Sequence, residues 1–270
     1  MQFSKKVRQD WAPILFFGVV VAAKTYYLIL NLSTSKELWG LLGNIGHLAE
    51  YGQGAAYFLT GSLSYILYYV IALAFDILVF LSFIGRTQAK ARPEGFWENV
   101  YPLITVFLPV LGYTLLFIPE VRQLVPGYSR RTLELMREIS PIFPFYMSLV
   151  GTLTGLVGAA FSIWAISYLR RSFGLRTAVR KLVTRGPYRW ARHPLYAGEI
   201  VHILGLAILS GTPVGFCLFA VAVALQIGRA KIEERKFLRS VPEYAAYRET
   251  TGFLWPRLRM RKSAYEESCS

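Results

Sequence analysis

The sequence contains few of the residues that metal centres and disulfide frameworks need. Its 270 residues include only two cysteines and three histidines. Cys217 lies in an apolar run and Cys269 in the polar C-terminal tail, so the cysteines predict neither a disulfide framework nor a metal cluster. Glu199 and His202 have a Glu-x-x-His spacing, but helical metal sites need several copies of that motif. We therefore expect no bound metal.

Acidic residues are also scarce, with 16 Asp and Glu against 30 Lys and Arg and a net charge of +14. Such a balance can mark a nucleic-acid-binding protein, but here the basic residues lie between long apolar runs. Positively charged cytoplasmic loops of a membrane protein explain this pattern better. Since 54% of the residues are hydrophobic and no repeat or low-complexity linker is present, we expect an integral membrane protein with no nucleic-acid partner.

Six apolar runs predict an all-α polytopic bundle with about six membrane spans. A helix needs about 20 apolar residues to cross the hydrocarbon core. Two short runs, Ile200–Ser210 and Val214–Ile227, are separated by Gly211-Thr212-Pro213. This tripeptide is typical of a turn, and Pro213 would break a continuous helix through it. We expect these last two runs to form a short helical hairpin. The four longer runs are Trp11–Leu32, Tyr57–Ile84, Val100–Ile118 and Ile142–Leu169.

The charge of the loops predicts the orientation. The N-terminus, residues 86–92, residues 170–192 and the tail from Arg229 are basic, and six spans place all of them on one side. The positive-inside rule makes that side cytoplasmic, with both termini on it. The 119–141 loop is an exception, because it falls outside yet carries four arginines. It is either an amphipathic interfacial helix or a sign that the span count differs there.

Two ionisable residues lie inside the first two spans. Measured at 1.5 Å per residue from the cytoplasmic ends, Lys24 and Asp76 reach a similar depth of roughly 13–18 Å. Charges inside a membrane are costly and usually paired, so we expect a structural ion pair. The alternative is that Lys24 extends to the interface while Asp76 faces a polar bundle interior.

Gly151, Gly155 and Gly158 form a small-residue face on the fourth span. Such a face suits close contact with another helix. The general frequency of glycine in membrane helices explains the same pattern equally well.

The stretch RGPYRWARHPLYAGE, residues 185–199, places arginines, a histidine and aromatic rings at the start of the hairpin. Its two prolines prevent one continuous helix, and irregular backbone at membrane depth must line a cavity or be covered by protein. Arginines suit carboxylate or phosphate groups, and aromatic rings suit a base or a cation. The alternative is an aromatic belt with topology-setting arginines at the membrane surface.

The sequence resembles a known family at this stretch. LVTRGPYRWARHPLYAGE (residues 182–199), followed beyond the hairpin by RAKIEERKFL (229–238) and EYAAY (243–247), is similar to the two-part signature of the isoprenylcysteine carboxyl methyltransferase family and its phospholipid methyltransferase relatives. The resemblance covers about residues 170–256. Two parts in order across a hairpin are far more specific than a lone His-Pro-x-Tyr.

The resemblance implies a methyltransferase that uses S-adenosylmethionine (SAM). The pocket would lie between the loop before the hairpin and the segment after it. Arg229 would bind the methyl acceptor, and Arg229, Glu233 and Glu234 would take part in catalysis. Arg180 and Lys181 depart from the family, in which some members have a histidine and a small polar residue. The residues that would contact SAM are Leu182, Val183, Tyr188, His193, Pro194, Leu195, Tyr196 and Glu233.

We accordingly divide the chain into residues 1–141, with spans that match no motif, and residues 142–270, the methyltransferase core. The expected acceptor is lipophilic, such as the carboxylate of a prenylated cysteine, and enters from the bilayer while SAM enters from the cytoplasm. A carboxylate or thiolate needs only positioning, whereas an amine would need deprotonation by Glu233 or Glu234. The alternative is an NADPH-dependent reductase of the sterol-reductase-like type. Residues 229–250 contain no histidine or tryptophan of the kind those reductases carry.

Overall fold

The computed structural model describes residues 2–34, 43, 52–84, 89–117 and 143–257. Within these ranges the regular structure is helical, apart from two isolated β-bridges. The predicted all-α class is therefore confirmed for the described part of the chain. The helices are α1 (Gln2–Thr34), α3 (Gly52–Ile84), α4 (Gly95–Asn99), α5 (Tyr101–Phe117), α8 (Phe143–Leu169), α9 (Pro194–Ser210), α10 (Pro213–Ser240) and α11 (Tyr244–Thr250), with short 3-10 turns η2 (Arg170–Ser172) and η3 (Gly186–Arg189).

A helix occupies each of the six ranges predicted to be a span. Two stretches, Leu149–Leu169 and Pro213–Ser240, are long and apolar enough to cross a membrane. Shorter apolar helices cover Ile14–Leu30, Val70–Ile84, Tyr101–Tyr113 and Pro194–Ser210. Six crossings therefore stay a prediction, and the 119–141 loop lies outside the described residues.

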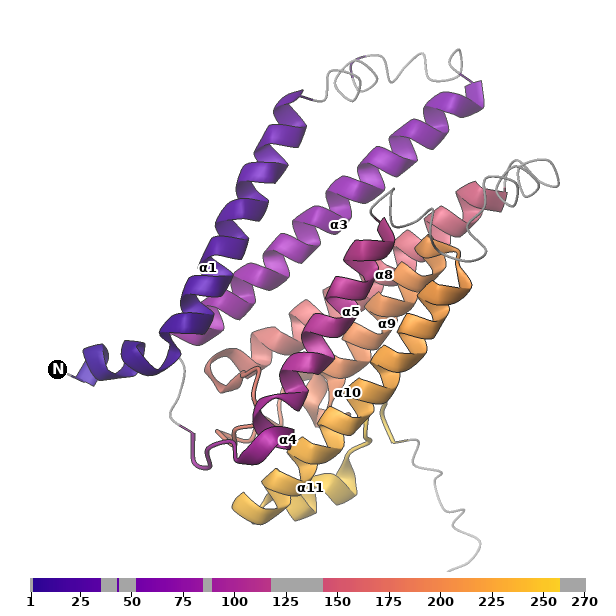
Figure 1. Ribbon diagram of the computed structural model, residues 1–270. Coiled ribbons are helices and arrows are strands. Elements are labelled where there is room, and N and C mark those ends of the chain that lie inside the picture. Colours follow the sequence, from indigo (N-terminus) through magenta and orange to yellow (C-terminus); the bar gives the residue numbers. More distant parts are fainter. Residues whose placement is uncertain (1, 35–42, 44–51, 85–88, 118–142, 258–270) are drawn as a thin grey trace, which may run out of the picture.

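The helices pack in an order that differs from their order in the sequence. Contacts run from α1 to α3, from α3 to α8, from α8 to α9, from α9 to α10, and from α10 to α5 (Figure 1). Helices α1 and α5 also meet, because the ring centres of Phe16 and Phe107 lie 5.8 Å apart. The lower ends of α8, α9 and α10, which are consecutive in this packing order, carry the candidate site.

Glycines let α8 and α9 approach until their backbones touch. A Cβ atom on Gly158 would lie 2.2 Å from the backbone nitrogen of His202, and one on Gly205 would lie 2.4 Å from that of Gly155. His202 Nδ1 also lies 3.0 Å from the carbonyl oxygen of Gly155. The small-residue face of the fourth span therefore serves close helix contact, as one of the two sequence readings predicted.

The hairpin turn forms where Gly211-Thr212-Pro213 predicted it. Gly211 ends α9 in the left-handed conformation with φ of 60°, and the Thr212 hydroxyl accepts a hydrogen bond from the Gly215 amide at 3.1 Å. Pro213 then starts α10 at a position that needs no amide donor. The expectation of two short helices is wrong for the second one, because α10 continues for 28 residues through the charged segment to Ser240.

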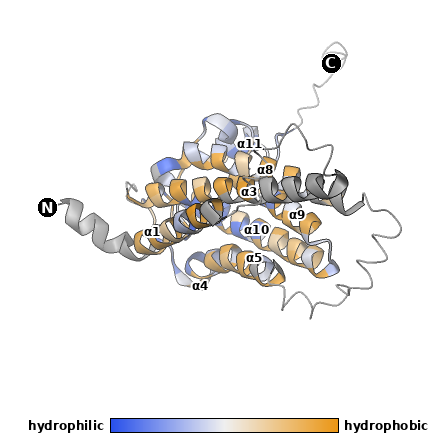
Figure 2. Cartoon of the chain, turned by 90° about the horizontal axis from the view of Figure 1, so that it is seen from above, coloured by the Kyte–Doolittle hydropathy of each residue, from blue (hydrophilic) through white to orange (hydrophobic). Residues whose placement is uncertain are grey.

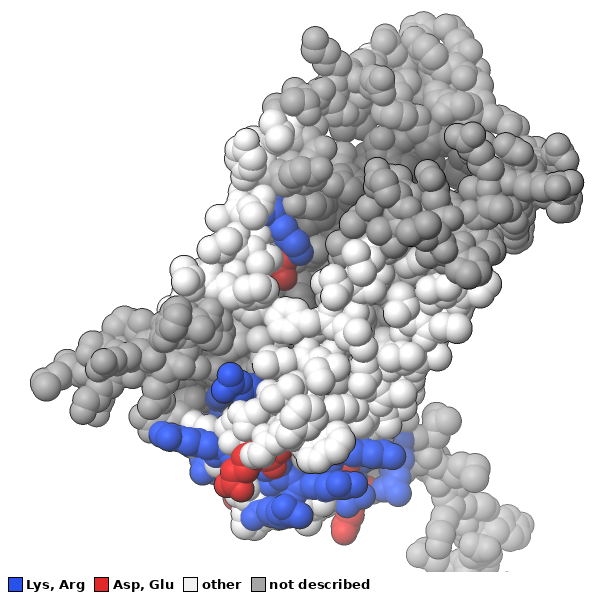
Figure 3. All heavy atoms as spheres, viewed as in Figure 1, with Lys and Arg blue, Asp and Glu red and all other residues white. Residues whose placement is uncertain are grey.

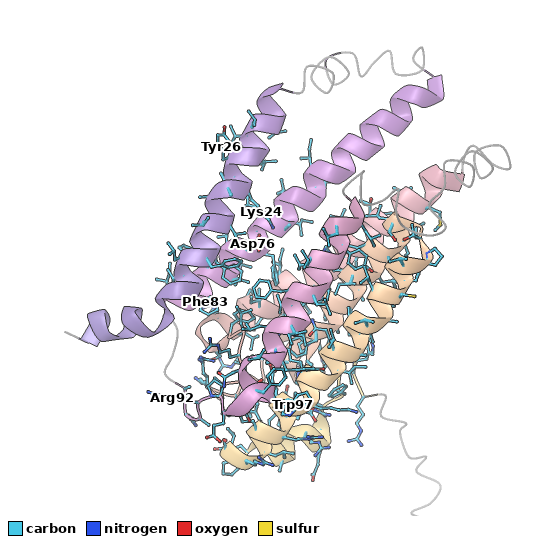
Figure 4. The ribbon with its side chains drawn as sticks, viewed as in Figure 1. Lys24, Tyr26, Asp76, Phe83, Arg92 and Trp97 are labelled. Carbon is cyan, nitrogen blue, oxygen red and sulfur yellow. The ribbon has the colours of Figure 1, made fainter. Side chains whose placement is uncertain are left out.

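The predicted intramembrane pair is confirmed. Lys24 Nζ donates to Asp76 Oδ2 at 2.5 Å and joins α1 to α3 (Figure 4). The Lys24 side chain keeps 34% of its surface exposed and that of Asp76 keeps 13%. The Lys24–Asp76 ion pair thus provides a polar contact between α1 and α3 within an otherwise apolar region.

Charge and hydropathy divide the molecule along its length. Described Lys, Arg, Asp and Glu side chains gather at the end that holds α4 and α11, and the Lys24–Asp76 pair stands apart from them (Figure 3). Away from that end the described helices are mostly hydrophobic along their length (Figure 2). Large apolar side chains lie exposed on them, for example those of Val19 on α1, Val110 on α5 and Val157 on α8. This distribution fits helices surrounded by lipid with one polar end in water.

Candidate active site

A pocket opens at the charged end, between the 172–193 segment and the lower halves of α9, α10 and α11. Four of the predicted residues that line it come from the segment before the hairpin: Leu182, Val183, Tyr188 and His193. Leu195 and Tyr196 of α9 and Glu233 of α10 complete the predicted set that lines it. Arg180 and Lys181, noted in the sequence as departures from the family, also line the pocket. The sequence assigned no role to the remaining lining residues, which include Phe173, Phe237, Tyr244 and Tyr247.

Three predicted site residues lie beside the pocket and do not line it. Pro194 is buried as the first residue of α9, where its missing amide donor costs nothing. Arg229 is 2% exposed and packs against pocket residues from behind. Glu234 points into a separate cluster of ion pairs on the other side of the 185–193 loop.

The loop gains its shape from one glycine and the two prolines. Gly186 has φ of 60°, and a Cβ atom there would lie 2.6 Å from the Tyr168 ring, so only glycine fits the turn that enters η3. Pro187 sits in η3 and is buried, and Pro194 starts α9 directly after His193. The aromatic and basic side chains between the two turns are therefore held on a short rigid segment.

The C-terminal segment fastens this loop from below. Arg192 and His193 donate their amides to the carbonyls of Gly252 and Phe253 at 2.9 and 3.0 Å, and Gly252 donates to Trp190 at 3.0 Å. These bonds form one of the two isolated bridges. Residues 251–253 carry no signature that sequence reasoning could have used, because the pairing depends on where α11 turns the chain back.

Three side chains join α9 to α10 at the pocket. The Tyr196 hydroxyl donates to Glu233 Oε1 at 2.5 Å, and the same oxygen lies 3.4 Å from Arg229 Nε. The Arg229 guanidinium stands 5.0 Å from the centre of the Tyr196 ring, while its NH2 group donates to the Leu175 carbonyl at 3.1 Å. The Arg-x-x-x-Glu spacing thus shares one helix face as predicted. Glu233 keeps a second carboxylate oxygen for a ligand.

Glu234 is engaged in a separate ion-pair cluster. Its Oε1 accepts from Arg192 Nε at 2.5 Å and lies 3.3 Å from His193 Nε2, and its Oε2 lies 3.8 Å from Arg248 Nε. Arg192 also donates to the Thr251 carbonyl at 2.5 Å. These contacts hold the loop, α10 and the C-terminal segment together. A catalytic role for Glu234 stays a prediction.

Tyrosines give the pocket hydroxyl groups that remain protonated. Burial and the nearby Glu233 carboxylate raise the pKa of Tyr188 well above its usual value. Burial likewise raises the pKa of Tyr244 and of Tyr247. Tyr247 donates to the Tyr188 carbonyl at 2.5 Å, but the Tyr188 hydroxyl itself is buried without a hydrogen-bond partner within the described structure. Such a group is costly unless a ligand satisfies it.

A segment before α5 also reaches the site, which the sequence did not reveal. Lys236 of α10 binds Glu98 of α4 and the carbonyl of Arg92. An antiparallel bridge joins Ala91 to Val179, with amide-to-carbonyl distances of 2.7–3.4 Å. Residues 89–99 therefore brace the 177–183 segment from outside the matched motif.

Arg189 and Trp190, to which the sequence assigned no role, lie on the outer face of the loop. Trp190 is 46% exposed, its ring centre lies 6.1 Å from that of Trp164, and the Arg189 guanidinium covers it at 5.5 Å. Partly exposed aromatic rings beside arginine at the end of apolar helices are typical of a membrane–water interface. The loop therefore fits both interpretations of its sequence, because its inner face forms a wall of the pocket and its outer face forms a surface suited to the membrane–water interface.

Comparison with known proteins defines the class of this site. Residues 146–243 match the model of the phospholipid methyltransferase family. The matched range contains all but the first turn of α8, together with the loop, the hairpin and all of the predicted site residues. The predicted family resemblance is thereby confirmed for this segment, which matches the phospholipid methyltransferase family. No support emerged for the reductase alternative.

Three curated proteins are similar over shorter stretches. The cobalt-zinc-cadmium resistance protein CzcN of Cupriavidus metallidurans is 40% identical over 78 residues, which is 28% of this chain and 36% of the relative. The nickel-cobalt-cadmium resistance protein NccN of Alcaligenes xylosoxydans xylosoxydans is 34% identical over 84 residues, 31% of this chain and 39% of the relative. The uncharacterized protein YpbQ of Bacillus subtilis is 40% identical over 57 residues, 20% of this chain and 33% of the relative.

The match thus spans only a third to two-fifths of each of these relatives. The metal-resistance names describe those two proteins. In the part of this chain that the structure describes, no group of three or more His, Cys, Asp or Glu residues is placed to hold a metal ion.

Proposed function

We propose that the protein is an integral membrane methyltransferase that binds SAM in the pocket beneath the hairpin and methylates a lipophilic acceptor. The observation that carries this proposal is the Tyr196–Glu233–Arg229 cluster, which joins the two halves of the family signature across the hairpin. The cluster lies at the junction of the charged end and the apolar helices. A water-soluble cofactor and a lipid-soluble acceptor can meet there.

The chemistry of the lining residues supports SAM as the ligand. The free oxygen of Glu233 suits an ammonium group, and the basic side chains of Arg180 and Lys181 suit a carboxylate. Aromatic and aliphatic side chains of Tyr188, Leu182 and Val183 suit the purine and ribose faces. The departure of Arg180 and Lys181 from some family members therefore leaves a pocket that still matches the cofactor's charges.

When bound, SAM supplies an electrophilic methyl group on a sulfonium. The protein's part is to hold the two reactants in line and to exclude water, which can contribute several kcal/mol to the rate, up to about 7–11 in favourable cases. Tyr196 and Glu233 fix the cofactor side of the site through their 2.5 Å hydrogen bond. Arg229, buried and stacked on Tyr196, lies beside the cofactor side of the site, where we expect it to position the acceptor.

Calorimetric titration of the purified protein in detergent tests the proposal. SAM is expected to bind with one site per chain, and NADPH is expected to give no heat of binding. Tyr196→Phe removes the hydroxyl that donates to Glu233 and keeps the ring under Arg229, so SAM affinity should fall by about tenfold. Binding of NADPH without binding of SAM would reject the methyltransferase and restore the reductase.

A further inference from the structure

A second polar contact joins α9 to α10 just above the pocket. Gln226 of α10 donates its amide nitrogen to the carboxylate of Glu199 on α9. Glu199 is three residues beyond Tyr196, and Gln226 is three residues before Arg229, so this contact lies about 4.5 Å further along the helices toward the apolar region. Neither residue lines the pocket below.

One buried hydrogen-bond acceptor at this level lacks a donor within the described structure. Gln226 is 3% exposed, and its side-chain oxygen has no hydrogen-bond partner within the described structure. Its amide nitrogen is engaged by Glu199, so the remaining side-chain oxygen of Gln226 can be satisfied only by a hydrogen-bond donor. An apolar contact between two helices would not require this pair. The site is therefore built for a ligand atom that carries hydrogen.

The charges around Arg229 favour the same kind of ligand. Arg229 interacts electrostatically with Glu233 on one side and with Glu199 on the other. Two carboxylates thus face a single guanidinium that already contacts the Tyr196 ring. Arg229 is already engaged by Glu233 and by the backbone carbonyls of Gly174 and Leu175, so it offers an incoming carboxylate less than a free guanidinium would. This favours a hydrogen-bearing acceptor over the carboxylate that the family resemblance implied.

We propose that Glu199 and Gln226 form the acceptor subsite and that Glu199 takes the proton from an acceptor bearing hydrogen on its reacting atom, such as an amine, hydroxyl or thiol. The hydrogen passes as a proton to the Glu199 carboxylate, and the freed electron pair of the acceptor atom forms the bond to the methyl carbon. The methyl–sulfur bond breaks with its electrons left on sulfur. This inference rests on the proposed function, since SAM must supply the methyl group.

The two residues lie across the Tyr196–Arg229 contact from the cofactor pocket. The cofactor pocket lies on the charged side of the Tyr196–Arg229 contact, and the Glu199–Gln226 pair lies on the apolar side. A displacement at carbon needs the nucleophile opposite the leaving sulfur. A lipid that enters between the helices would present its head group from that opposite side.

The test uses four probes that share an oleyl chain and differ in the reacting group: oleylamine, oleyl alcohol, oleyl thiol and oleic acid. Labelled methyl transfer from SAM is measured with the full-length protein in mixed micelles across a range of pH. Glu199→Gln is compared with the unchanged protein. Tyr113→Phe serves as a control, because it removes another buried interhelical bond, from Tyr113 to the Gly215 carbonyl at 2.7 Å, away from the site.

Glu199→Gln is expected to bind SAM as well as the unchanged protein, and to lose about 10²-fold or more in transfer to a hydrogen-bearing probe. The pH dependence due to Glu199 should disappear in this variant and persist in Tyr113→Phe. Binding of each probe without SAM is followed by calorimetry in buffers of different ionisation enthalpy, which measures the number of protons exchanged on binding. This number should differ from that of the unchanged protein in Glu199→Gln and should be the same in Tyr113→Phe.

Three results would overturn the inference while leaving SAM binding intact: transfer to oleic acid alone, transfer to none of the hydrogen-bearing probes, or an unchanged rate and pH profile in Glu199→Gln. Failure of the unchanged protein to bind SAM would instead reject the proposed function itself.

Discussion

The two helix pairs of this molecule are fastened in opposite ways. Helices α8 and α9 meet through glycines whose backbones touch, whereas α1 and α3 meet through bulky side chains and one ion pair. The first pair lies inside the family match at residues 146–243, and the second lies outside it. Close backbone contact between α8 and α9 fixes the distance between the two helices. The α8–α9 pair is therefore a rigid frame for the pocket, whereas the side-chain contacts between α1 and α3 could instead be formed by other residues.

The strongest expected effect concerns the ion-pair cluster beneath the frame. Glu234→Ala leaves Arg192 with a buried unpaired charge, since both side chains are about one-tenth exposed. Breaking such a pair costs about 3–5 kcal/mol. We expect a large drop in thermal stability in detergent, with faster proteolysis after residue 240. Glu243→Ala, an exposed glutamate nearby, should change neither. A stable Glu234→Ala protein that binds SAM but transfers no methyl would favour the catalytic reading instead.

The glycine contact comes next and tests the comparison directly. Gly158→Ala drives a Cβ atom into the α9 backbone, where nothing can move aside, and should cost about 1–3 kcal/mol. Gly18→Ala on α1 meets only the Phe80 ring at 3.3 Å and should cost less than about 1 kcal/mol. Thermal unfolding of both variants in the same detergent measures the difference. Equal losses would show that the two pairs are not fastened differently.

The third prediction concerns the pocket. Glu233→Gln removes the charge that faces the cofactor's ammonium group while preserving the side-chain shape. Charge-assisted hydrogen bonds contribute about 1.5–3 kcal/mol, so SAM affinity should fall by roughly 10–100-fold. Titration calorimetry measures the loss, with Glu243→Gln as the charge-matched control. An unchanged affinity would remove Glu233 from the site.

The smallest effect is expected in the N-terminal pair. Lys24→Met and Asp76→Leu should each destabilise the fold, and the double variant should recover most of the loss, because an unpaired charge costs more than an apolar pair. The coupling should be about 0.5–1.5 kcal/mol. A double-mutant cycle by thermal unfolding gives this value. SAM affinity should be unchanged in all three variants, and a change would contradict a purely structural pair.

Local chemistry made much of the fold predictable. The turn at Gly211–Pro213 and the α8 glycine face follow from what glycine and proline allow in helices. The Lys24–Asp76 pair follows from the cost of charge in lipid and from equal depth. The length of α10 was misjudged because the apolar run ends at residue 227, while packing continues the helix through charged residues to Ser240.

The site was predictable where the residues lie in one motif and hidden where distant segments meet. Tyr188, His193, Tyr196 and Glu233 were identified from the signature, and all four line the pocket. The pairing of residues 190–193 with 252–253 and the contact of Lys236 with Glu98 were missed. These contacts join segments up to 138 residues apart, and no local pattern encodes them.

Transfer of a labelled methyl group from SAM to a membrane lipid extract tests the central claim most directly. The purified protein should label an apolar product, and Glu233→Gln should label much less of it at the same SAM concentration. Absence of any labelled lipid with a protein that is folded and supplied with SAM would contradict the account.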